Sequence, residues 1–259
     1  MNFDAINTEE IKSFYIENGY AVINPVITDD ELAEVRAEVE AKMGKFQLGA
    51  ASTFQMNDLA LKIEHVLEHI FKPEYVSVLK SILDCEALDL QHSKYNAKNP
   101  LGGSRVPLHQ DFPFFPHTDQ RILAFNFHLD GSSKENGGMY VYPGEWNSPL
   151  PHDDTSKGFK EISQKYVQQK DKVYFECVPG SVTIHSSFIP HGSDETQNEA
   201  KRRMLVFQMR NPLNKQVGGC IWRCNGYNPV SKRFNDPIQT WNGKIIEGRR
   251  IWEPKEYFE

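Results

Sequence analysis

From about residue 87 onward, the chain consists of short hydrophobic runs that Gly, Pro and Asn interrupt. This pattern is typical of a β-sandwich or a β-barrel. No internal repeat, low-complexity tract or Ser/Gly-rich linker breaks the series. The chain is therefore expected to be mainly β. The expected strands are residues 87–95, 105–112, 121–129, 138–142, 172–178, 181–186 and 202–209.

The first 86 residues place hydrophobic side chains at helical spacing. Thr28 and Glu31 form a capping box, whose hydroxyl and carboxylate satisfy backbone N–H groups at the start of a helix. Gly19 stands where an earlier helix would end, and a short strand is expected at residues 20–24. The helices are expected to brace the sheet. Their hydrophobic residues are Ile11, Phe14 and Tyr15; Leu32, Val35, Val39 and Met43; Ile63, Val66, Leu67 and Ile70; and Val76, Leu79, Ile82 and Leu83.

A chain of 259 residues, 39% of them hydrophobic, is long enough to bury one sizeable core. We expect a single domain over residues 1–259. Within it, residues 1–86 form a mostly helical brace, residues 87–210 form the β core, and residues 211–259 form a C-terminal segment that packs on the core or caps it.

The composition favours a small-molecule ligand. The formal net charge is −6, and no basic cluster is longer than Lys201-Arg202-Arg203, which argues against a nucleic-acid surface. No stretch approaches the roughly 18 apolar residues of a membrane span, and no basic region with an apolar run behind it opens the chain. Four scattered cysteines fit a reducing compartment. We expect a cytoplasmic monomer or homodimer that binds no nucleic acid and no membrane.

Two distant segments carry residues that could close on one metal ion. His109 and Asp111 are two positions apart, and in an extended strand this spacing puts both side chains on the same face. His191 lies in the second segment, far downstream. Two imidazoles and one carboxylate suit Fe(II) and leave three coordination positions open for a co-substrate and oxygen. Open positions indicate catalysis rather than a structural role.

These candidate ligands belong to three motifs that occur in a fixed order along the chain. The ordered set is His109-Gln110-Asp111-Phe112 with an aromatic and proline run behind it, Glu135-Asn136-Gly137-Gly138 leading to Tyr142-Pro143-Gly144, and His191-Gly192-Ser193 with Arg202 eleven positions after His191. On these residues, the sequence resembles the phytanoyl-CoA dioxygenase-like family of Fe(II)- and 2-oxoglutarate-dependent oxygenases. The resemblance implies a mainly β fold with flanking helices, whose core is a double-stranded β-helix (jelly-roll, cupin-like).

The resemblance also implies roles for single residues. His109, Asp111 and His191 would bind Fe(II), and Arg202 would pair with the distal carboxylate of 2-oxoglutarate through its planar guanidinium. Lys98 occupies a place where relatives carry a basic or polar contact to this co-substrate.

The implied reaction consumes O2 and 2-oxoglutarate, releases succinate and CO2, and hydroxylates a small molecule, either a metabolite or a natural-product intermediate. Because Asp111 stands where related halogenases have a small residue, halogenation is not expected. Desaturation and cyclisation stay open.

Alternation along two strands refines the expected site. On 202–209, the face that begins with Arg203 is the more apolar one, which leaves Arg202 on the face of the polar cavity, with Arg203 as the second choice. On 121–129, Asn126 and His128 share the inward face, where Asn126 is expected to contact co-substrate or substrate. His185 is expected behind the metal ligands.

Two other functions compete with the oxygenase. His65, Glu68 and His69 match the H-x-x-E-H pattern of inverzincin zinc peptidases, with both His on one helix face. The same residues also fit the wet side of an amphipathic helix. The second alternative is a jelly-roll that binds a small ligand without turnover, for which open iron positions would have no use.

The substrate leaves few marks on the sequence. Aromatic and basic residues after the first ligands and in the C-terminal segment are the candidates for substrate contacts, although aromatic residues are also expected in a core. The candidates are Phe112, Phe115, His117, Arg210, Trp222 and Arg223.

Overall fold

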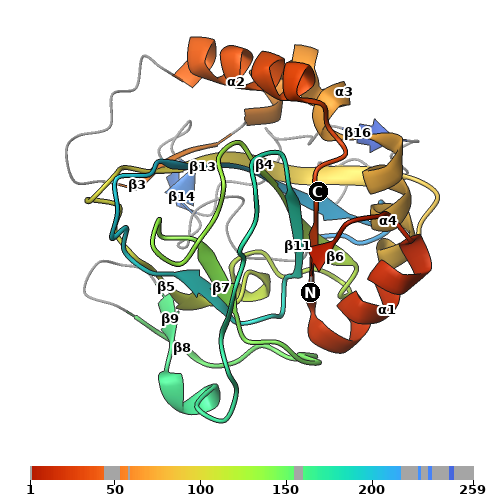
Figure 1. The fold of residues 1–259 in the computed structure, drawn as a ribbon. Helices are drawn as coiled ribbons and strands as arrows, with labels where there is room; N and C mark the ends of the chain where they lie inside the picture. The colour runs from red at the N-terminus through yellow and green to blue at the C-terminus, as the bar shows by residue number, and fades with distance from the viewer. Residues whose placement is uncertain are drawn as a thin grey trace.

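The computed structural model describes residues 2–43, 53–57, 59–154 and 160–216, together with the backbone of three short strands farther on. Within this part, two β-sheets face each other and helices cover one of them from outside, as Figure 1 shows. The predicted mainly β, jelly-roll class is confirmed by this architecture and by the solved structures described below. The division into one domain with three parts stays a prediction.

The larger sheet has eight strands in the described part of the chain. Their order is β1 (Asn2–Phe3), β2 (Tyr20–Ile23), β11 (Val182–Ser186), β6 (Ile122–His128), β13 (Arg202–Arg210), β4 (Leu88–Lys98) and β16 (Ile245–Glu247), with β3 (Thr53–Asn57) also paired with β4. The smaller sheet runs β10 (Val173–Tyr174), β7 (Met139–Val141), β12 (His191–Ser193) and β5 (Val106–His109). Two separate hairpin pairs are β8 (His152–Asp154) with β9 (Lys160–Ile162), and β14 (Tyr227–Asn228) with β15 (Arg233–Phe234).

The helices pack on the outer face of the larger sheet. They are α1 (Thr8–Asn18), α2 (Asp29–Met43), α3 (Leu67–Ile70) and α4 (Pro73–Leu83), and the 3-10 turns η1 (Leu59–Leu61) and η2 (Glu64–Val66) lie with them. Two further 3-10 turns, η3 (Phe112–Phe114) and η4 (Gln164–Tyr166), lie outside this layer. Gly19 ends α1 at a φ of 77°, a left-handed conformation that glycine adopts without strain. At the start of α2, the Thr28 N–H donates to Glu31 Oε2 (2.9 Å) and the Glu31 N–H donates to Thr28 Oγ1 (3.3 Å), so the predicted capping box is present.

Two hydrophobic cores lie on opposite faces of the larger sheet. The outer core joins the helices to one face of the sheet, where Phe71 packs on Phe125 and Phe207. The inner core fills part of the space between the two sheets. Its members include Val22, Val141, Phe175, Met204 and Val206. Strand alternation therefore sends apolar side chains outward to the helices and leaves the other face for the interior of the barrel.

Two expected elements differ from those observed. Residues 63–70 were expected to form one helix, but the segment is divided into η2 and α3. Val66, the last residue of η2, has backbone angles outside the α-helical region (φ −113°, ψ 7°). The strand expected at 105–112 ends at His109, and η3 begins at Phe112 with Pro113 in its first turn. Proline offers no N–H to a neighbouring strand, which favours this early end. The sequence did not predict eight of the strands in the described part of the chain, which are β1, β3, β8, β9, β12, β14, β15 and β16.

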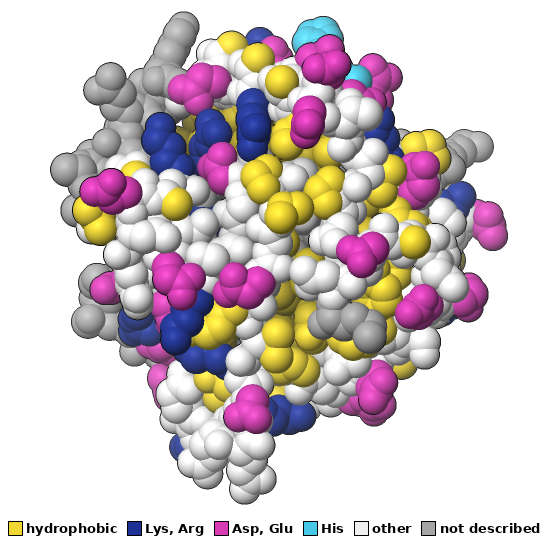
Figure 2. All heavy atoms as spheres, in the orientation of Figure 1, with side chains coloured by type: hydrophobic (Ala, Val, Ile, Leu, Met, Phe, Trp, Pro, Cys, Tyr) yellow, Lys and Arg dark blue, Asp and Glu magenta, His cyan; other side chains and the backbone are white. Residues whose placement is uncertain are grey.

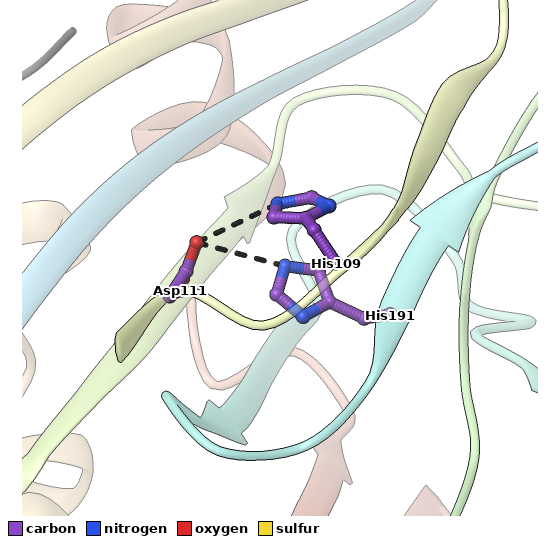
Figure 3. A group of neighbouring side chains, drawn as sticks. All are labelled: His109, Asp111 and His191. Atoms are coloured by element: carbon purple, nitrogen blue, oxygen red, sulfur yellow. Dashed lines mark ion pairs between the residues drawn. The ribbon is translucent and has the colours of Figure 1, made fainter. Parts of the chain in front are cut away.

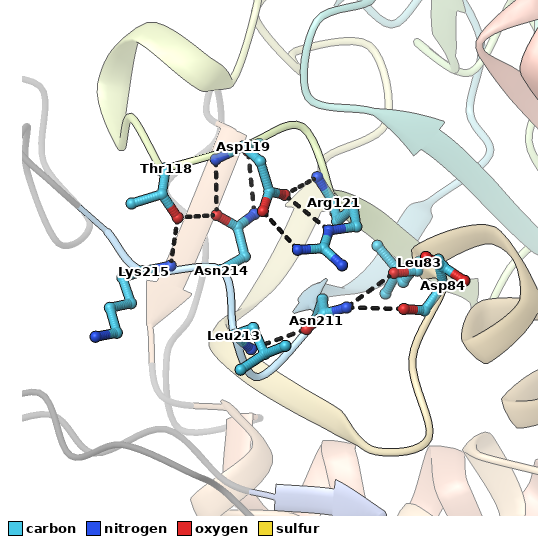
Figure 4. Close-up of polar contacts among 9 residues, drawn as sticks. All are labelled: Leu83, Asp84, Thr118, Asp119, Arg121, Asn211, Leu213, Asn214 and Lys215. Atoms are coloured by element: carbon cyan, nitrogen blue, oxygen red, sulfur yellow. Dashed lines mark hydrogen bonds and ion pairs between the residues drawn. The ribbon is translucent and has the colours of Figure 1, made fainter.

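Buried asparagines fasten the segment after β13 to the body of the molecule (Figure 4). Asn214 accepts from Thr118 Oγ1 and the Asp119 N–H through Oδ1, both at 3.1 Å, and donates to the Asp119 carbonyl through Nδ2 (3.1 Å). Asn211 donates to the carbonyls of Leu83 (3.2 Å) and Asp84 (2.9 Å) at the end of α4. These bonds hold the loop that leads into β6, so they fix the end of the barrel next to η3.

The surface carries both signs of charge. Figure 2 shows acidic and basic side chains interspersed over one face, with hydrophobic side chains between them. None of the helices in the described ranges is long and apolar enough to cross a membrane.

Candidate metal centre

A cavity of about 80 Å³ opens between the two sheets. Its wall combines side chains of β4, β6, β11 and β13 with side chains of β5, β7 and β12. The lining residues are Gln55, Lys94, Asn96, Val106, His109, Asp111, Ala124, Asn126, Met139, His185, His191, Gly192, Ser193, Arg202, Met204, Val206 and Gln208.

His109, Asp111 and His191 converge on one point of this cavity, as Figure 3 shows. His109 ends β5 and His191 begins β12, and the two residues are paired across the antiparallel strands. Asp111 Oδ1 lies 3.6 Å from His109 Nε2 and 3.8 Å from His191 Nε2. All three ligand atoms lie within 4.8 Å of one another, and all three residues are buried. In the described ranges, this is the one group of His, Cys, Asp and Glu side chains with such a geometry.

Backbone carbonyls fix the tautomer of both histidines. His109 Nδ1 lies 2.8 Å from the Pro107 carbonyl, and His191 Nδ1 lies 2.9 Å from the Ile189 carbonyl. A carbonyl only accepts, so each Nδ1 carries the proton and each Nε2 presents its lone pair to the centre. Metal-bound histidines are held in this way. The donor set and its orientation therefore fit a divalent metal ion.

Asp111 reaches the centre from a turn and not from a strand. Its backbone is helical (φ −73°, ψ −38°), so the predicted same-face geometry of a strand over His109 and Asp111 is wrong, although the convergence itself is present. Gln208 Nε2 donates to Asp111 Oδ2 at 2.5 Å, which leaves Oδ1 to face the histidines. Burial alone would raise the pKa of Asp111, but the neighbouring imidazoles of His191, His109 and His185 hold this pKa well below its usual range.

A third histidine stands beside the ligands with its tautomer reversed. Asn126 Nδ2 lies 3.2 Å from His185 Nδ1 and 3.2 Å from Thr183 Oγ1. The amide group donates, so His185 Nδ1 accepts and Nε2 carries the proton. This Nε2 lies 3.7 Å from Asp111 Oδ2. His185 thus lines the cavity and presents a donor to the centre, and Asn126 orients it.

The two arginines at the start of β13 point to opposite sides of the larger sheet. Arg202 lines the cavity and is 2% exposed, and burial lowers the pKa of its guanidinium to about 10. Its Nε has no hydrogen-bond partner within the described chain. Arg203 faces outward and pairs with Asp130 (Nε to Oδ2, 2.8 Å) and Glu40 (3.2 Å). A buried cation without an acid is suited to a carboxylate ligand.

Lys98 is buried beside this arginine, across the β4–β13 pairing, but does not line the cavity. Its ammonium donates to Ser193 Oγ (2.7 Å) and to the Asp194 carbonyl (2.5 Å). Burial and the neighbouring Arg202 lower its pKa to about 7. Its contact to the co-substrate stays a prediction.

The residues expected to contact substrate lie mostly away from the cavity wall. Phe112 stacks on Phe188 with ring centroids 4.2 Å apart, and Phe115 packs in a small cluster with Phe114 and Ile122. None of the four described candidates, which are Phe112, Phe115, His117 and Arg210, lines the cavity.

His117 and Arg210 belong to a buried polar network. Arg210 donates to Asp89 Oδ2 through Nε (3.0 Å) and Nη2 (2.9 Å), and its Nη1 lies 3.1 Å from His117 Nε2. Trp222 and Arg223 lie outside the described residues.

The zinc-peptidase pattern does not gather a metal site. His65 lies in η2, whereas Glu68 and His69 lie in α3, so no continuous helix presents the two histidines on one face. His69 instead contacts two carboxylates of α2, Glu34 at 3.0 Å and Glu31 at 3.5 Å. The interpretation as a wet helix face holds, and the peptidase hypothesis is not supported.

Comparisons with known proteins agree with this site. A family model described as phytanoyl-CoA dioxygenase (PhyH) matches residues 15–204. The chain is 26% identical, over 281 aligned residues, to a probable alpha-ketoglutarate-dependent hypophosphite dioxygenase of Stutzerimonas stutzeri. The alignment covers 94% of this chain and 97% of that protein.

Solved structures share the fold at low identity. The carbocyclase SnoK from nogalamycin biosynthesis superposes with a TM-score of 0.71 at 18% identity, over 82% of this chain and 87% of its own. EctD from S. alaskensis, solved with 2-oxoglutarate and 5-hydroxyectoine, superposes with a TM-score of 0.67 at 17% identity, over 83% and 79%.

A jelly-roll that brings two histidines and one carboxylate together in a buried cavity defines the class of non-haem Fe(II)- and 2-oxoglutarate-dependent oxygenases. Within this class, the chain belongs to the phytanoyl-CoA dioxygenase family. Fe(II), 2-oxoglutarate and O2 are accordingly its cofactor and co-substrates, and its substrate is a small molecule.

Proposed function

We propose that the chain hydroxylates a small molecule at an iron held by His109, Asp111 and His191, with 2-oxoglutarate anchored by Arg202. The observation that carries this proposal is the convergence of two Nε2 lone pairs and one carboxylate oxygen within 4.8 Å. When bound, iron supplies the activation of O2 at the expense of 2-oxoglutarate, which leaves as succinate and CO2.

The side chains around the iron position have separate tasks. Gln208 holds the Asp111 carboxylate in one orientation through the 2.5 Å bond to Oδ2. His185 offers its Nε2–H toward the same centre, and Asn126 keeps it in that tautomer. At the far end of the cavity, the buried Arg202 guanidinium supplies the charge that a distal carboxylate needs. Met139, Met204 and Val206 supply the apolar part of the wall between these groups.

One relative that aligns over nearly the whole chain is named for hypophosphite, a small phosphorus oxyanion. Small oxyanions therefore stand first among the substrates to be tested. The cavity of about 80 Å³ is small beside the roughly 300–1,000 Å³ of sites for drug-sized ligands, which favours a compact substrate. Oligomeric state and cellular compartment stay as predicted from the sequence, a monomer or homodimer in the cytoplasm.

A succinate-release screen tests the proposal. The iron-loaded protein is incubated with 2-oxoglutarate, O2 and a panel that contains hypophosphite, small phosphonates, small carboxylates and amino acids. We expect one class to raise succinate release at least tenfold above the rate without substrate, with a hydroxylated product in equal amount. His191→Ala is the matched blank, because it removes one ligand and leaves the 2-oxoglutarate end of the cavity in place.

Binding separates the remaining outcomes. Anaerobic addition of Fe(II) and 2-oxoglutarate should give a weak visible charge-transfer band with the wild type and none with His191→Ala. If the band is absent from the wild-type protein, the chain holds no working iron centre and the jelly-roll binds its ligand without turnover. If the band forms but the product is a desaturated or cyclised compound, hydroxylation is the wrong reaction.

A further inference from the structure

Besides Arg202, the cavity wall carries a second positively charged side chain. Lys94 lines the cavity from β4 and is half-buried. It makes no hydrogen bond or ion pair with any residue in the described chain. By contrast, Lys98, four residues farther along β4, donates hydrogen bonds to Ser193 Oγ and the Asp194 carbonyl. A half-buried ammonium without a partner loses part of its hydration and gains nothing in return. Such a group is suited to receiving an anionic ligand.

Strand register separates Lys94 from the arginine that faces 2-oxoglutarate. Lys94 is paired with Val206, four residues after Arg202 on β13, which corresponds to roughly 13 Å at about 3.3 Å per residue. Side chains of a sheet stand nearly perpendicular to it. The backbone positions of Lys94 and Arg202 therefore lie at different levels of the cavity. On the other side, Val206 is only two residues from Gln208, the residue that holds Asp111. Lys94 thus lies nearer the level of the metal ligands.

The balance of charges in the cavity also favours an anionic substrate. The described lining of the cavity contains three charged side chains, which are Lys94, Arg202 and Asp111. Ferrous iron adds two positive charges, dianionic 2-oxoglutarate adds two negative charges, and histidines that bind metal are neutral. The loaded site therefore keeps one positive charge. A substrate with a single negative charge would neutralise it, whereas a neutral substrate would leave Lys94 buried and unpaired.

Asn96 is the second group that awaits a ligand. It lines the cavity two residues from Lys94, on the same face of β4, and its Oδ1 is buried without a hydrogen-bond partner in the described chain. Its register partner on β3 is Gln55, which also lines the cavity. An ammonium with two amides beside it can bind the oxygens of a small anion and also a polar group attached to it.

We propose that Lys94, with Asn96 and Gln55, is the substrate anchor of this enzyme and that the substrate is a small oxyanion, oriented by its charge toward the iron. This inference rests on the proposed function, because it takes Arg202 as the residue that binds the distal carboxylate of 2-oxoglutarate. The shared chemistry is a compact group with a delocalised negative charge, which either a carboxylate or a phosphorus oxyanion provides.

The test measures binding, independently of turnover. Protein loaded anaerobically with Fe(II) and 2-oxoglutarate is titrated calorimetrically with hypophosphite, methylphosphonate, acetate and the neutral acetamide. We expect at least one anion to bind, and Lys94→Met to weaken that anion at least tenfold while acetamide binding stays unchanged. Lys94→Arg, which keeps the charge, should stay within about threefold of the wild type. The tighter class of anion identifies whether the enzyme takes a phosphorus oxyanion or a carboxylate.

The control variant is Lys42→Met, which makes the same change at an exposed lysine of α2 whose side chain is 46% accessible. It should bind every probe as the wild type does. Lys94→Gln replaces Lys94→Met if the latter does not fold, as judged by its circular dichroism.

Three results would overturn the assignment. The first is unchanged anion affinity in Lys94→Met. The second is a tenfold loss of affinity for 2-oxoglutarate in this variant, which would mean that Lys94 binds the co-substrate and not the substrate. The third is a wild-type protein that forms the charge-transfer band and binds none of the anions. Loss of the band itself in the wild type contradicts the proposed function instead, so the two failures are distinguishable.

Discussion

Gln208 is the residue that decides which oxygen of Asp111 faces the histidines. Its amide donates to Oδ2 at 2.5 Å, and Oδ1 is then the oxygen within 3.6 and 3.8 Å of the two Nε2 atoms. A carboxylate with both oxygens free could rotate and lose this alignment. Partners that orient metal ligands commonly contribute about 10- to 100-fold to metal affinity.

We therefore predict that Gln208→Leu lowers the affinity for Fe(II) about 10- to 100-fold while the fold is retained. Anaerobic titration with Fe(II) in the presence of a competing chelator measures the change. Gln120→Leu is the matched control, because it makes the same substitution at an exposed position of the loop before β6. Equal iron affinity in both variants would mean that Gln208 does not orient the carboxylate.

His128 makes the stability of the protein depend on pH. It is completely buried on β6, its Nε2 lies 3.1 Å from Thr183 Oγ1, and burial lowers its pKa to about 3. In the unfolded chain, a histidine titrates near 6.5. Only the unfolded state therefore takes up this proton between about pH 6.5 and 3, so the stabilisation is complete above pH 6.5 and is lost as the pH falls through this window.

Replacing this histidine should remove part of that dependence. Between pH 7.5 and 5.5, the wild type should lose about 1 kcal/mol of unfolding free energy through His128 alone, and His128→Asn should lose correspondingly less over the same interval. Urea denaturation of the metal-free protein at both pH values gives the difference. His65→Asn, an exposed histidine of η2, is the control and should keep the full wild-type slope. The same slope in His128→Asn would contradict the assignment.

Single residues were predictable from the sequence where their type limits their chemistry. His109, Asp111 and His191 were predicted as a group because few other functions need two imidazoles and a carboxylate together. Gln208 and Lys94 were not predicted as part of the site, since glutamine and lysine are common on any strand and only the register of β13 and β4 brings them to the cavity. Only the folded structure shows that Lys94 is half-buried in the cavity and has no hydrogen-bond or ion-pair partner in the described chain.

At the scale of elements, alternation along β13 and β6 was the most informative pattern. Leu205, Phe207 and Met209 join the outer core with Phe125 and Phe127. Most of the alternate residues line the cavity, namely Ala124 and Asn126 of β6 and Arg202, Met204, Val206 and Gln208 of β13. The ends of strands were harder to predict from the sequence, because they depend on which neighbouring strands they pair with. Pro107 lies on β5, which is an edge strand of the smaller sheet in the described part of the chain, and an edge strand tolerates a residue without an N–H. The helix expected at 63–70 is divided, with Ile63, Leu67 and Ile70 all buried against the sheet.

The opposite directions of Arg202 and Arg203 allow a paired test of β13. Arg202→Ala should weaken 2-oxoglutarate binding roughly 10- to 100-fold, since a hydrogen bond to a charged group contributes about 1.5–3 kcal/mol. Arg203→Ala should leave this affinity unchanged and lower the unfolding free energy by about 1 kcal/mol, because it removes the partly buried pair with Asp130. Calorimetric titration with 2-oxoglutarate and urea denaturation of both variants provide the two measurements. A loss of co-substrate affinity in Arg203→Ala and not in Arg202→Ala would reverse the assignment.

At the scale of the whole molecule, the larger sheet is the element that both cores share. Its outer face packs against α1, α2, α3 and α4 (Figure 1). Its inner face forms the cavity with the smaller sheet. The layers were predictable from the change of pattern near residue 87. The pairing of distant strands was not, because a strand sequence does not record its neighbours: β11 lies between β2 and β6, and β13 between β6 and β4. His191 meets His109 only through such a pairing, between β12 and β5.

Phe71 tests whether the helical layer and the β core unfold as one unit. Its ring centroid lies 5.1 Å from that of Phe125 and 4.9 Å from that of Phe207, so it joins the end of α3 to the two central strands β6 and β13. Phe71→Ala leaves a cavity between the layers and should lower the unfolding free energy by about 3–5 kcal/mol. Ile16→Ala, at a side chain of α1 that is 60% exposed, should change it by no more than about 0.5 kcal/mol.

The shape of the transition then decides the domain organisation. Helix unfolding is followed by far-ultraviolet circular dichroism, and the β core by the charge-transfer band of the anaerobic complex with Fe(II) and 2-oxoglutarate. In a single domain, both signals disappear at the same urea concentration, in the wild type and, at lower urea, in Phe71→Ala, because neither layer keeps a covered hydrophobic face without the other. A circular dichroism change that precedes the loss of the band would show that the residue 1–86 layer unfolds separately. In that case the prediction of one domain over residues 1–259 is wrong.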